Sequence, residues 1–309
     1  MSLGLCCQFI QPVTKRTGNV VYKNIIEEKT LQLGAFKAGK YPLSRIRSTY
    51  HHNVDQHIKL IPKLVKLNIR SFRLTSGLFP LWDMNSQMIK DDAILVGKLA
   101  KLGKLFTDNG IRVTTHPGQF TVISSDNPNV VKNSITELEY HAWVFDAMGL
   151  PLSSYAAINI HGGKANRSSA IVSVYNSLPD NIRSRLTLEN DEKCYSVQQL
   201  LDVHDRCGVP VVFDSHHFTF NTSNMSFAQA FDDTRSTWGK IKPLQHISNT
   251  EPGFENAAFN QKRAHSQYIH RIPDMQLEAM QADTIDVDVE AKHKNLALLD
   301  MRSKFNISC

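Results

Sequence analysis

The sequence predicts an α/β protein folded as a single (β/α)8 TIM barrel, and three observations lead to this class. Short β-rich runs alternate with longer stretches of helical period along all 309 residues. The length fits one barrel with insertions, because such barrels commonly take about 250 residues. Neither a Ser/Gly/Pro-rich linker nor a Gly-x-Gly-x-x-Gly motif after the first strand supports the rival, a two-domain doubly wound fold.

The strand candidates are eight β-rich runs. In chain order they span residues 3–8, 69–74, 111–115, 155–160, 185–189, 210–214, 244–248 and 284–290. Amphipathic segments lie between them, at residues 53–67, 91–109, 128–148, 197–207 and 291–304. Gly110 and Gly208 follow two of these helices, where a left-handed C-cap residue is expected. Strand and helix units in this order close into a parallel barrel.

One long excursion, at about residues 9–52, separates the first two strands of the single domain that we expect over residues 1–309. Basic residues mix with tyrosines in it. They are Lys15, Arg16, Lys37, Lys40, Arg45 and Arg47, with Tyr22, Tyr41 and Tyr50. Two interpretations stay open, a solvated loop and a surface that contacts phosphates.

Composition places the chain among ordinary globular proteins, with 41% hydrophobic and 21% charged residues. The basic excess, 35 Lys and Arg against 29 Asp and Glu, is compatible with a polyanionic partner. Five cysteines without a Cys-x-x-Cys pair support neither a disulfide framework nor a zinc ribbon. Because no apolar run reaches membrane-spanning length and residues 1–15 lack a secretory pattern, we expect an intracellular protein without a membrane partner.

Metal-capable side chains stand at the carboxyl ends of the last six predicted strands, which in a barrel point into one shared cup. They are His116, His161, Glu189, Asp214 with His217 three residues on, His246 and Glu290. His265, after the seventh strand, could add an eighth ligand. A lone histidine on a strand is more often structural. Several unpaired imidazoles and carboxylates facing one cavity, however, would repel or remain poorly solvated, and divalent cations neutralise them.

Imidazole and carboxylate without thiolate suit zinc or manganese, and these groups exceed the needs of one tetrahedral ion. The sequence therefore predicts two or three divalent ions. Clustered ions lower the pKa of a bound water and clamp the attacking and leaving oxygens of a displacement at phosphorus, which fits phosphodiester hydrolysis. The chemical rival is a sugar aldose–ketose isomerase, which would use a pair of such ions.

Six strings stand in barrel order at strand ends and together resemble the UV damage endonuclease family. They are His116-Pro-Gly-Gln-Phe120, His161-Gly-Gly, Leu188-Glu-Asn190, Phe213-Asp-Ser-His-His217, His246-Ile-Ser248 and Glu290-Ala-Lys292. Phe72-Arg-Leu-Thr-Ser76 and Leu78-Phe-Pro80 add support, so that the resemblance covers nearly the whole chain. It implies a xylose-isomerase-like barrel that binds damaged double-stranded DNA and cuts the backbone 5′ to the lesion without ATP.

The resemblance also implies roles for the strand-end residues, with Mn²⁺ as the metal and Zn²⁺ or Mg²⁺ as alternatives. His116, His161 and Glu189 would hold one ion. A second would be held by Glu189 as a bridge with Asp214, His246 and Glu290, and a third by His217 and His265. Glu189, His246 and Glu290 are the expected catalytic residues. His216 is one residue out of register with the Asp-x-x-His spacing, and is expected either to support a metal ligand from behind or to be structural.

A pair of residues after His116 would enter the duplex at the lesion. The matching residues are Gln119 and Phe120, where Phe keeps the apolar wedge that the family builds from Tyr. Gly118 is expected to take a positive φ and let the loop approach DNA. Plain core packing is the other interpretation of Phe120.

This chain departs from the family pattern at two positions. Leu244 stands where the family commonly has a lysine, often carboxylated, and Leu5 stands where a tyrosine is expected. The first change removes a candidate bridge at the metal site, and the second removes a contact at the lesion pocket. Substrate range is therefore less sharply implied than the reaction class.

The leading hypothesis is a metal-dependent DNA repair endonuclease acting on UV photoproducts and on other helix distortions. An abasic-site endonuclease of the same fold, a sugar isomerase and a catalytically dead DNA-binding module are the alternatives. The dead module predicts broken ligands, whereas all eight positions carry metal-capable side chains. We further expect a monomer that uses no nucleotide cofactor.

Overall fold

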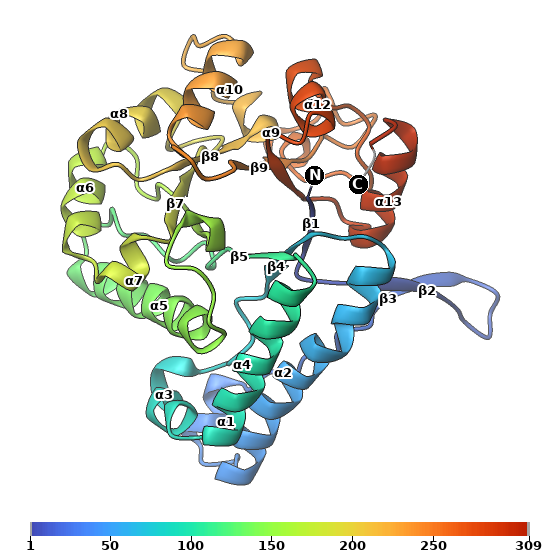
Figure 1. Ribbon diagram of the computed structural model, residues 1–309, viewed down its shortest axis with the longest axis vertical. Coiled ribbons are helices and arrows are strands. Elements are labelled where there is room, and N and C mark those ends of the chain that lie inside the picture. Colours follow the sequence, from blue (N-terminus) through green and yellow to red (C-terminus); the bar gives the residue numbers. More distant parts are fainter. Residues whose placement is uncertain (1, 308–309) are drawn as a thin grey trace.

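The computed structural model describes residues 2–307, in which eight parallel strands close a barrel surrounded by helices (Figure 1). The single-domain (β/α)8 fold is confirmed, as is each of the eight predicted strands. The barrel strands, in order around it, are β1 (Leu3–Cys6), β4 (Ser71–Leu74), β5 (Arg112–Thr115), β6 (Ile158–His161), β7 (Leu186–Glu189), β8 (Val211–Asp214), β9 (Leu244–Ile247) and β10 (Asp286–Val289). Pairs such as Leu3 with Val287 close the barrel between its first and last strands.

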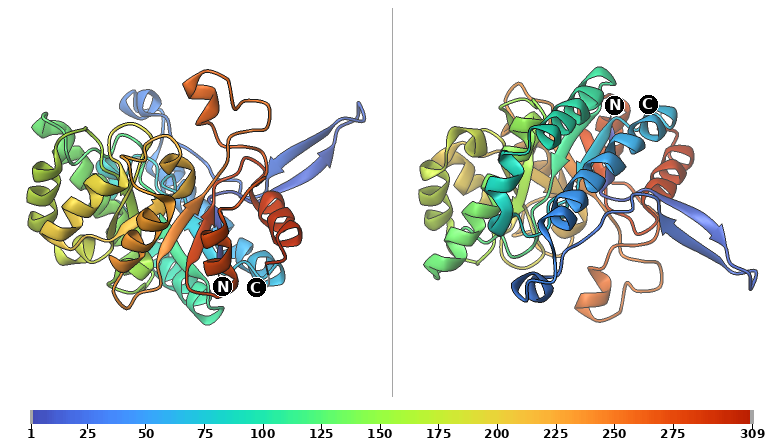
Figure 2. Two further views of the ribbon diagram at one scale, coloured as in Figure 1. Left: turned by 90° about the horizontal axis from the view of Figure 1, so that it is seen from above. Right: turned by 90° about the horizontal axis from the view of Figure 1, so that it is seen from below.

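Helices form the outer layer (Figures 1 and 2). Those of eight or more residues are α2 (Leu43–Lys66), α3 (Trp82–Lys90), α4 (Ala93–Asp108), α5 (Pro128–Ala147), α6 (Ser168–Ser177), α8 (Val197–Cys207), α10 (Phe227–Ser236), α12 (Asp274–Gln281) and α13 (Lys294–Lys304). The short ones are α1 (Leu33–Lys37), α7 (Asp180–Arg183), α9 (Ser215–Phe218), α11 (Phe259–Lys262) and the 3₁₀ turn η1 (Ser154–Ala156). Helix α8 has the predicted bounds, with a Ser196 capping box and Gly208 at φ +77°.

Helix α2 begins at Leu43 instead of residue 53, and this boundary of the prediction was wrong. Ile46, Tyr50 and Val54 recur every four residues on the buried face of α2, but exposed basic residues between them hide that period. Pro42 at the N-cap is compatible with this start, because the N-terminal residues of a helix lack intrahelical acceptors for their N–H groups.

Part of the excursion between β1 and α2 is regular structure, contrary to the expected loop. Strands β2 (Ile10–Thr14) and β3 (Val20–Asn24) pair antiparallel and are joined by a turn in which Gly18 has φ +81°. Figure 2 shows this two-stranded ribbon standing out from the body of the protein. The sequence carried its turn signal, but Pro12 and scattered polar residues obscured the strand pattern.

The interior of the barrel changes character from one end to the other. At the amino end, Ala157, Val212 and Leu244 pack with Trp238 in an apolar cluster. Farther along, the Asp288 carboxylate accepts hydrogen bonds from Ser71 and Thr114, at 3.3 and 3.2 Å. Gly4 makes room for it, since a Cβ there would lie 1.8 Å from Asp288 Oδ1. Histidines and carboxylates that could hold metal ions therefore gather at the carboxyl ends of the strands, beyond Asp288.

Two further expectations concern the cysteines and membrane-spanning helices. Cys6, Cys7, Cys194 and Cys207 are all free thiols, as expected; the fifth, Cys309, lies outside the described residues. Among residues 2–307, no helix combines the length and the apolar character that crossing a membrane requires.

Candidate metal centre

The metal-capable side chains meet in one cup at the carboxyl ends of β5 to β10. His116 follows β5, and His161, Glu189 and Asp214 are the last residues of β6, β7 and β8. His246 lies in β9 and Glu290 directly follows β10. Since parallel strands end at the same face of a barrel, residues far apart in sequence become neighbours. Residues 116 to 290 thereby supply one site.

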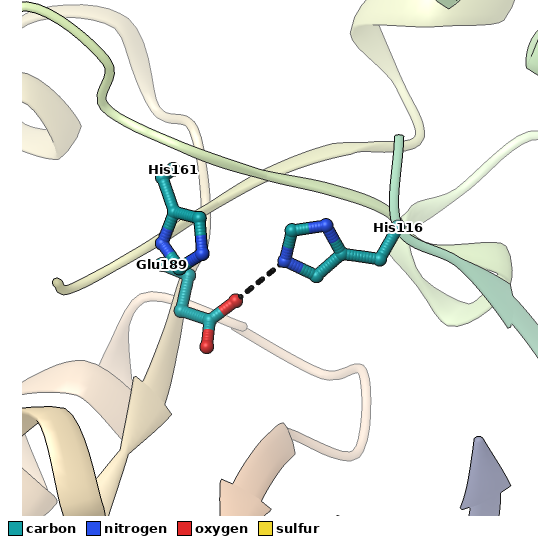
Figure 3. A group of neighbouring side chains, drawn as sticks. All are labelled: His116, His161 and Glu189. Carbon is teal, nitrogen blue, oxygen red and sulfur yellow. Dashed lines mark hydrogen bonds and ion pairs between the residues drawn. The ribbon is translucent and has the colours of Figure 1, made fainter. Parts of the chain in front are cut away.

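Glu189 lies at the centre of the cup and is buried. Its Oε2 is 3.0 Å from His116 Nε2 and accepts a 2.5 Å hydrogen bond from Asn159, while Oε1 is 2.8 Å from His246 Nδ1. Figure 3 shows the carboxylate reaching His116, with the ring of His161 beside it. Burial opposes ionisation, but His246, His161 and these hydrogen bonds hold the pKa of Glu189 well below its ordinary value. Glu189 is therefore held as the carboxylate anion.

Three overlapping groups of side chains bring their ligand atoms within 4.8 Å of one another. They are His116, His161 and Glu189; Glu189, Asp214 and His217; and Asp214, His246 and Glu290. Glu189 and Asp214 each belong to two groups and so link all three. The first group matches the set implied by the resemblance. The other two divide the remaining ligands differently, because His217 lies with Glu189 and Asp214.

His217 and His265 differ in how deeply they sit. His217 Nδ1 is 3.0 Å from the Asn190 carbonyl and 3.8 Å from Glu189 Oε1, while Nε2 is 3.9 Å from Glu192 Oε2. Burial lowers the pKa of His217, but the Asp214, Glu189 and Glu290 carboxylates outweigh it and raise the pKa to about 10. His265 is at the rim, with its side chain 36% exposed and Nε2 3.4 Å from Glu290 Oε2. None of the three groups includes His265.

Buried atoms in the cup lack hydrogen-bond partners within the described chain. His161 Nδ1 and Asp214 Oδ2 are two of them, and the neighbouring His216 Nε2 is a third. Buried polar atoms are normally paired, so atoms left without partners need an explanation. The Asp214 oxygen is a lone-pair donor, as is an imidazole nitrogen without its proton, and a divalent cation would satisfy both. The residues present thus fit oxygen- and nitrogen-liganded metal ions such as Mn²⁺ or Zn²⁺.

Arg73 is a component of the site to which the sequence reasoning gave no role. It projects from β4, with Nε 3.2 Å from Asp288 Oδ2 and Nη2 2.8 Å from His246 Nε2, and it also pairs with Glu290. Burial opposes ionisation of Glu290, yet Arg73, His246 and His265 hold its pKa well below the ordinary range. The available signal was an arginine inside the apolar run Phe72 to Leu74, because a buried cation requires buried anions.

A cavity of about 700 Å³ opens above the ligands. Its lining includes Gln119 and the cationic side chains of Lys164, Lys193 and Arg263. Phe120 stands next to it and is 83% exposed, so the core-packing interpretation of this residue is wrong. Gly118 is not among the positive-φ residues, which corrects the expectation for its backbone. The loop after β5 therefore presents an uncovered aromatic ring beside the cavity.

The two departures from the family pattern are both buried. Leu244 lies within the apolar cluster of the barrel and Leu5 lies in the main core, and neither side chain is exposed. Neither lines the cavity.

The fold and the cup define the class: a (β/α)8 barrel whose carboxyl face gathers histidines and carboxylates into linked ligand groups. Within this class, the UV-endonuclease UvdE family matches residues 15–308. A UV DNA damage endonuclease from Nostoc sp. is 38% identical over 267 residues, which cover 84% of this chain and 80% of that protein. One from Deinococcus radiodurans is 35% identical over 243 residues, 76% of each chain. The chain belongs to the UvdE family, and is thus a DNA repair endonuclease by descent.

Solved structures agree with this placement. The crystal structure of SacUVDE is 26% identical and superimposes with a TM-score of 0.80 over 100% of both chains. A D-tagatose 3-epimerase-like protein, 9% identical, gives a TM-score of 0.52 over 99% of this chain and 97% of its own. The second likeness shows a shared fold alone.

Proposed function

We propose that this protein hydrolyses the phosphodiester bond on the 5′ side of UV photoproducts in double-stranded DNA, with pyrimidine dimers as the main substrates and other distorting lesions as a wider range. The observation that carries the proposal is the chain of three ligand groups linked by Glu189 and Asp214 at the base of the cavity. We propose Mn²⁺ as the ion, with Zn²⁺ or Mg²⁺ as alternatives, in a monomeric intracellular enzyme that needs no nucleotide cofactor.

The residues of the cup have different roles in this proposal. Divalent ions bound there supply a water of lowered pKa and neutralise charge that develops on the phosphate. Glu189 stays ionised and bridges two ligand groups, so it holds the site together instead of donating a proton. His246 and Glu290 complete the group around Asp214, and Arg73 orients both of them through direct contacts. His265 at the rim is placed to meet the DNA backbone or a third ion.

Gln119 and Phe120 provide the selectivity for damage in this proposal. The Phe120 side chain is 83% exposed to water, although burying an aromatic ring is favourable by about 2 kcal/mol. Inserted between base pairs, it would regain that burial. A damaged step costs less to open than an intact one, so the same wedge discriminates between them.

An incision assay tests the proposal. The substrate is an end-labelled duplex with one thymine dimer, incubated with Mn²⁺ or with EDTA, beside the same duplex carrying an abasic site. We expect a single nick 5′ to the dimer that EDTA abolishes. Cutting of the abasic duplex alone would move the protein to abasic-site repair, and cutting of neither duplex by metal-loaded protein would make sugar isomerisation the next activity to assay.

A further inference from the structure

The ribbon formed by β2 and β3 has almost no support from the rest of the protein along its outer length. It starts four residues after the carboxyl end of β1, on the face of the barrel that holds the cup, and projects away from the body (Figure 2). Most of its side chains are exposed, including Val20 at 55% and Tyr22 at 45%. Two strands alone are marginally stable in water, so such a ribbon gains from a partner.

The base of the ribbon, in contrast, is firmly held. The Asn295 side chain both donates to the Ile10 carbonyl and accepts from the Ile10 amide, at 3.0 and 2.7 Å. The ring of Tyr22 packs on that of His293, 4.7 Å between centroids. His293 and Asn295 lie in the segment that begins with Glu290. The ribbon is therefore anchored next to the site and held in one direction from it.

The charge of the ribbon is of one sign. Lys15, Arg16 and Lys23 are exposed, and residues 8–26 contain no Asp or Glu. Within residues 2–307, no carboxylate forms an ion pair with any of these three side chains. Three unpaired cations on a projecting element attract a polyanion. Two copies of the chain joined through their ribbons would instead bring like charges together.

We propose that the ribbon binds the phosphate backbone of the DNA duplex on one flank of the lesion, outside the segment that covers the cup. This rests on the proposed function, because it takes duplex DNA as the ligand. A two-stranded β-ribbon has dimensions that a DNA major groove admits, and Lys15, Arg16 and Lys23 provide the phosphate contacts. Such contacts fix position and orientation without reading sequence.

The salt dependence of binding tests the ribbon directly. We compare the wild type with Lys15→Ala/Arg16→Ala/Lys23→Ala on a duplex of about 30 base pairs with a central thymine dimer. The slope of log K against log salt falls by about 0.9 for each phosphate that the protein no longer neutralises, so the variant is expected to lower it by about 2.7 and to bind at least about tenfold more weakly. A duplex shortened on both flanks should show little difference between the two proteins.

Two matched controls separate this role from general charge and from folding. Lys66→Ala/Lys104→Ala/Lys240→Ala removes three exposed lysines that lie near the amino end of the barrel, and it should keep the wild-type slope. Lys15→Arg/Lys23→Arg keeps the ribbon charge and should also keep it. Unchanged Mn²⁺ affinity and melting temperature of the ribbon variant show that the cup and fold survive the substitutions.

The outcomes distinguish the ribbon from the proposed activity. If the wild type nicks the dimer but the ribbon variant keeps the full slope, the ribbon proposal is overturned and the activity stands. If the wild type does not nick yet binds duplex with a ribbon-dependent slope, the ribbon stands and the activity fails. A ribbon variant that changes the oligomeric state in light scattering, with unchanged DNA affinity, would make the ribbon an interface between copies and overturn the proposal.

Discussion

Two buried arginines, Arg112 and Arg73, lie inside opposite ends of the barrel, and their partners are mostly backbone carbonyls for Arg112 but all ionisable side chains for Arg73. Arg112, at the amino end, donates to the carbonyls of Ser154, Tyr155 and Lys242 and pairs with Asp286 at 3.0 Å. Arg73, toward the carboxyl end, has ionisable partners: Asp288, Glu290 and His246.

The difference separates structural from functional use of buried charge. Three of the partners of Arg112 are backbone carbonyls, which cannot titrate, and the fourth is the buried carboxylate of Asp286, so its role is to close one end of the barrel. The partners of Arg73 include groups that also belong to the metal-ligand set, and buried atoms without partners lie close by. A site built for a ligand holds groups that the empty protein does not satisfy, at a cost in stability.

The largest expected effect is on incision and comes from the carboxyl end of the barrel, where Glu189→Gln removes the carboxylate that links two ligand groups. Incision should fall by roughly 10⁴-fold, because residues that act as a unit fail together. Lesion binding should stay within a few fold, since Gln119 and Phe120 are untouched. Single-turnover incision and a gel shift on the same dimer duplex measure the two quantities. Retained cutting would remove Glu189 from the mechanism.

At the amino end of the barrel, Arg112→Met should lower the free energy of unfolding by about 3–5 kcal/mol, the usual loss when one partner of a buried pair is removed. Urea unfolding measures this change. The double variant Arg112→Met/Asp286→Asn should recover part of the loss, because it no longer leaves a buried carboxylate without Arg112. Mn²⁺ affinity equal to that of the wild type would confirm that the two ends act independently.

Metal binding in the cup should stabilise the folded protein. Mn²⁺ at a hundred times its Kd is expected to add about 2.7 kcal/mol to the free energy of unfolding, provided that it binds the folded chain alone. Asp214→Asn, which weakens two ligand groups, should lose most of this increment, whereas Arg112→Met should retain it. Thermal melts with Mn²⁺ and with EDTA provide the comparison. An equal increment in the Asp214 variant would argue against the assigned ligands.

Phe120→Ala tests the rim of the cavity. Stacking of one base on an aromatic ring contributes about 1–3 kcal/mol, so discrimination between damaged and intact duplex should fall about tenfold. Nonspecific binding should change less, because it depends on phosphate contacts. A competitive gel shift with unlabelled intact duplex separates these terms. Phe120→Tyr restores an aromatic wedge and is the matched control.

The smallest effect concerns Glu28, which approaches the end of β4 through a hydrogen bond to Thr75. Burial raises its pKa to about 7, so the folded protein holds this proton more tightly than the unfolded chain. That contribution to stability is complete below about pH 4.5, the ordinary value, and is lost as the pH rises through 7. Glu28→Gln should therefore be more stable than the wild type at pH 8 and equally stable at pH 4. Urea midpoints at the two pH values provide the measurement.

The barrel could be predicted because its strands are short β-rich runs separated by stretches of helical period. What failed were elements with a mixed pattern. In α2, exposed Arg45 and Arg47 interrupt the apolar period, and in the ribbon both faces meet water, so no alternation of buried and exposed residues exists to be read. A periodic pattern of apolar residues indicates that one face of a helix or strand is buried. An element without a buried face has no such pattern and cannot be predicted from it.

The cup was predicted because a barrel converts strand ends into neighbours whatever their distance in sequence. The contacts between side chains within the cup were not predicted. The contact between Asn159 and Glu189 and the reach of Arg73 to His246 depend on strand register and side-chain rotamer, which no local pattern specifies. The position of His265 at the rim likewise depends on the path of a loop.

The pairing of β1 with β10 has a consequence for the order of events during synthesis. The barrel closes only when Leu3 pairs with Val287, so Val287 must first be synthesised, and Glu290 follows it by three residues. The nascent chain thus carries His116, His161 and Glu189 long before Glu290, the last candidate ligand, is synthesised. Contacts of such sequence separation form late and slowly. A chain interrupted anywhere before its last strand therefore remains an open sheet without a complete cup, which couples the capacity to cut DNA to completion of the polypeptide.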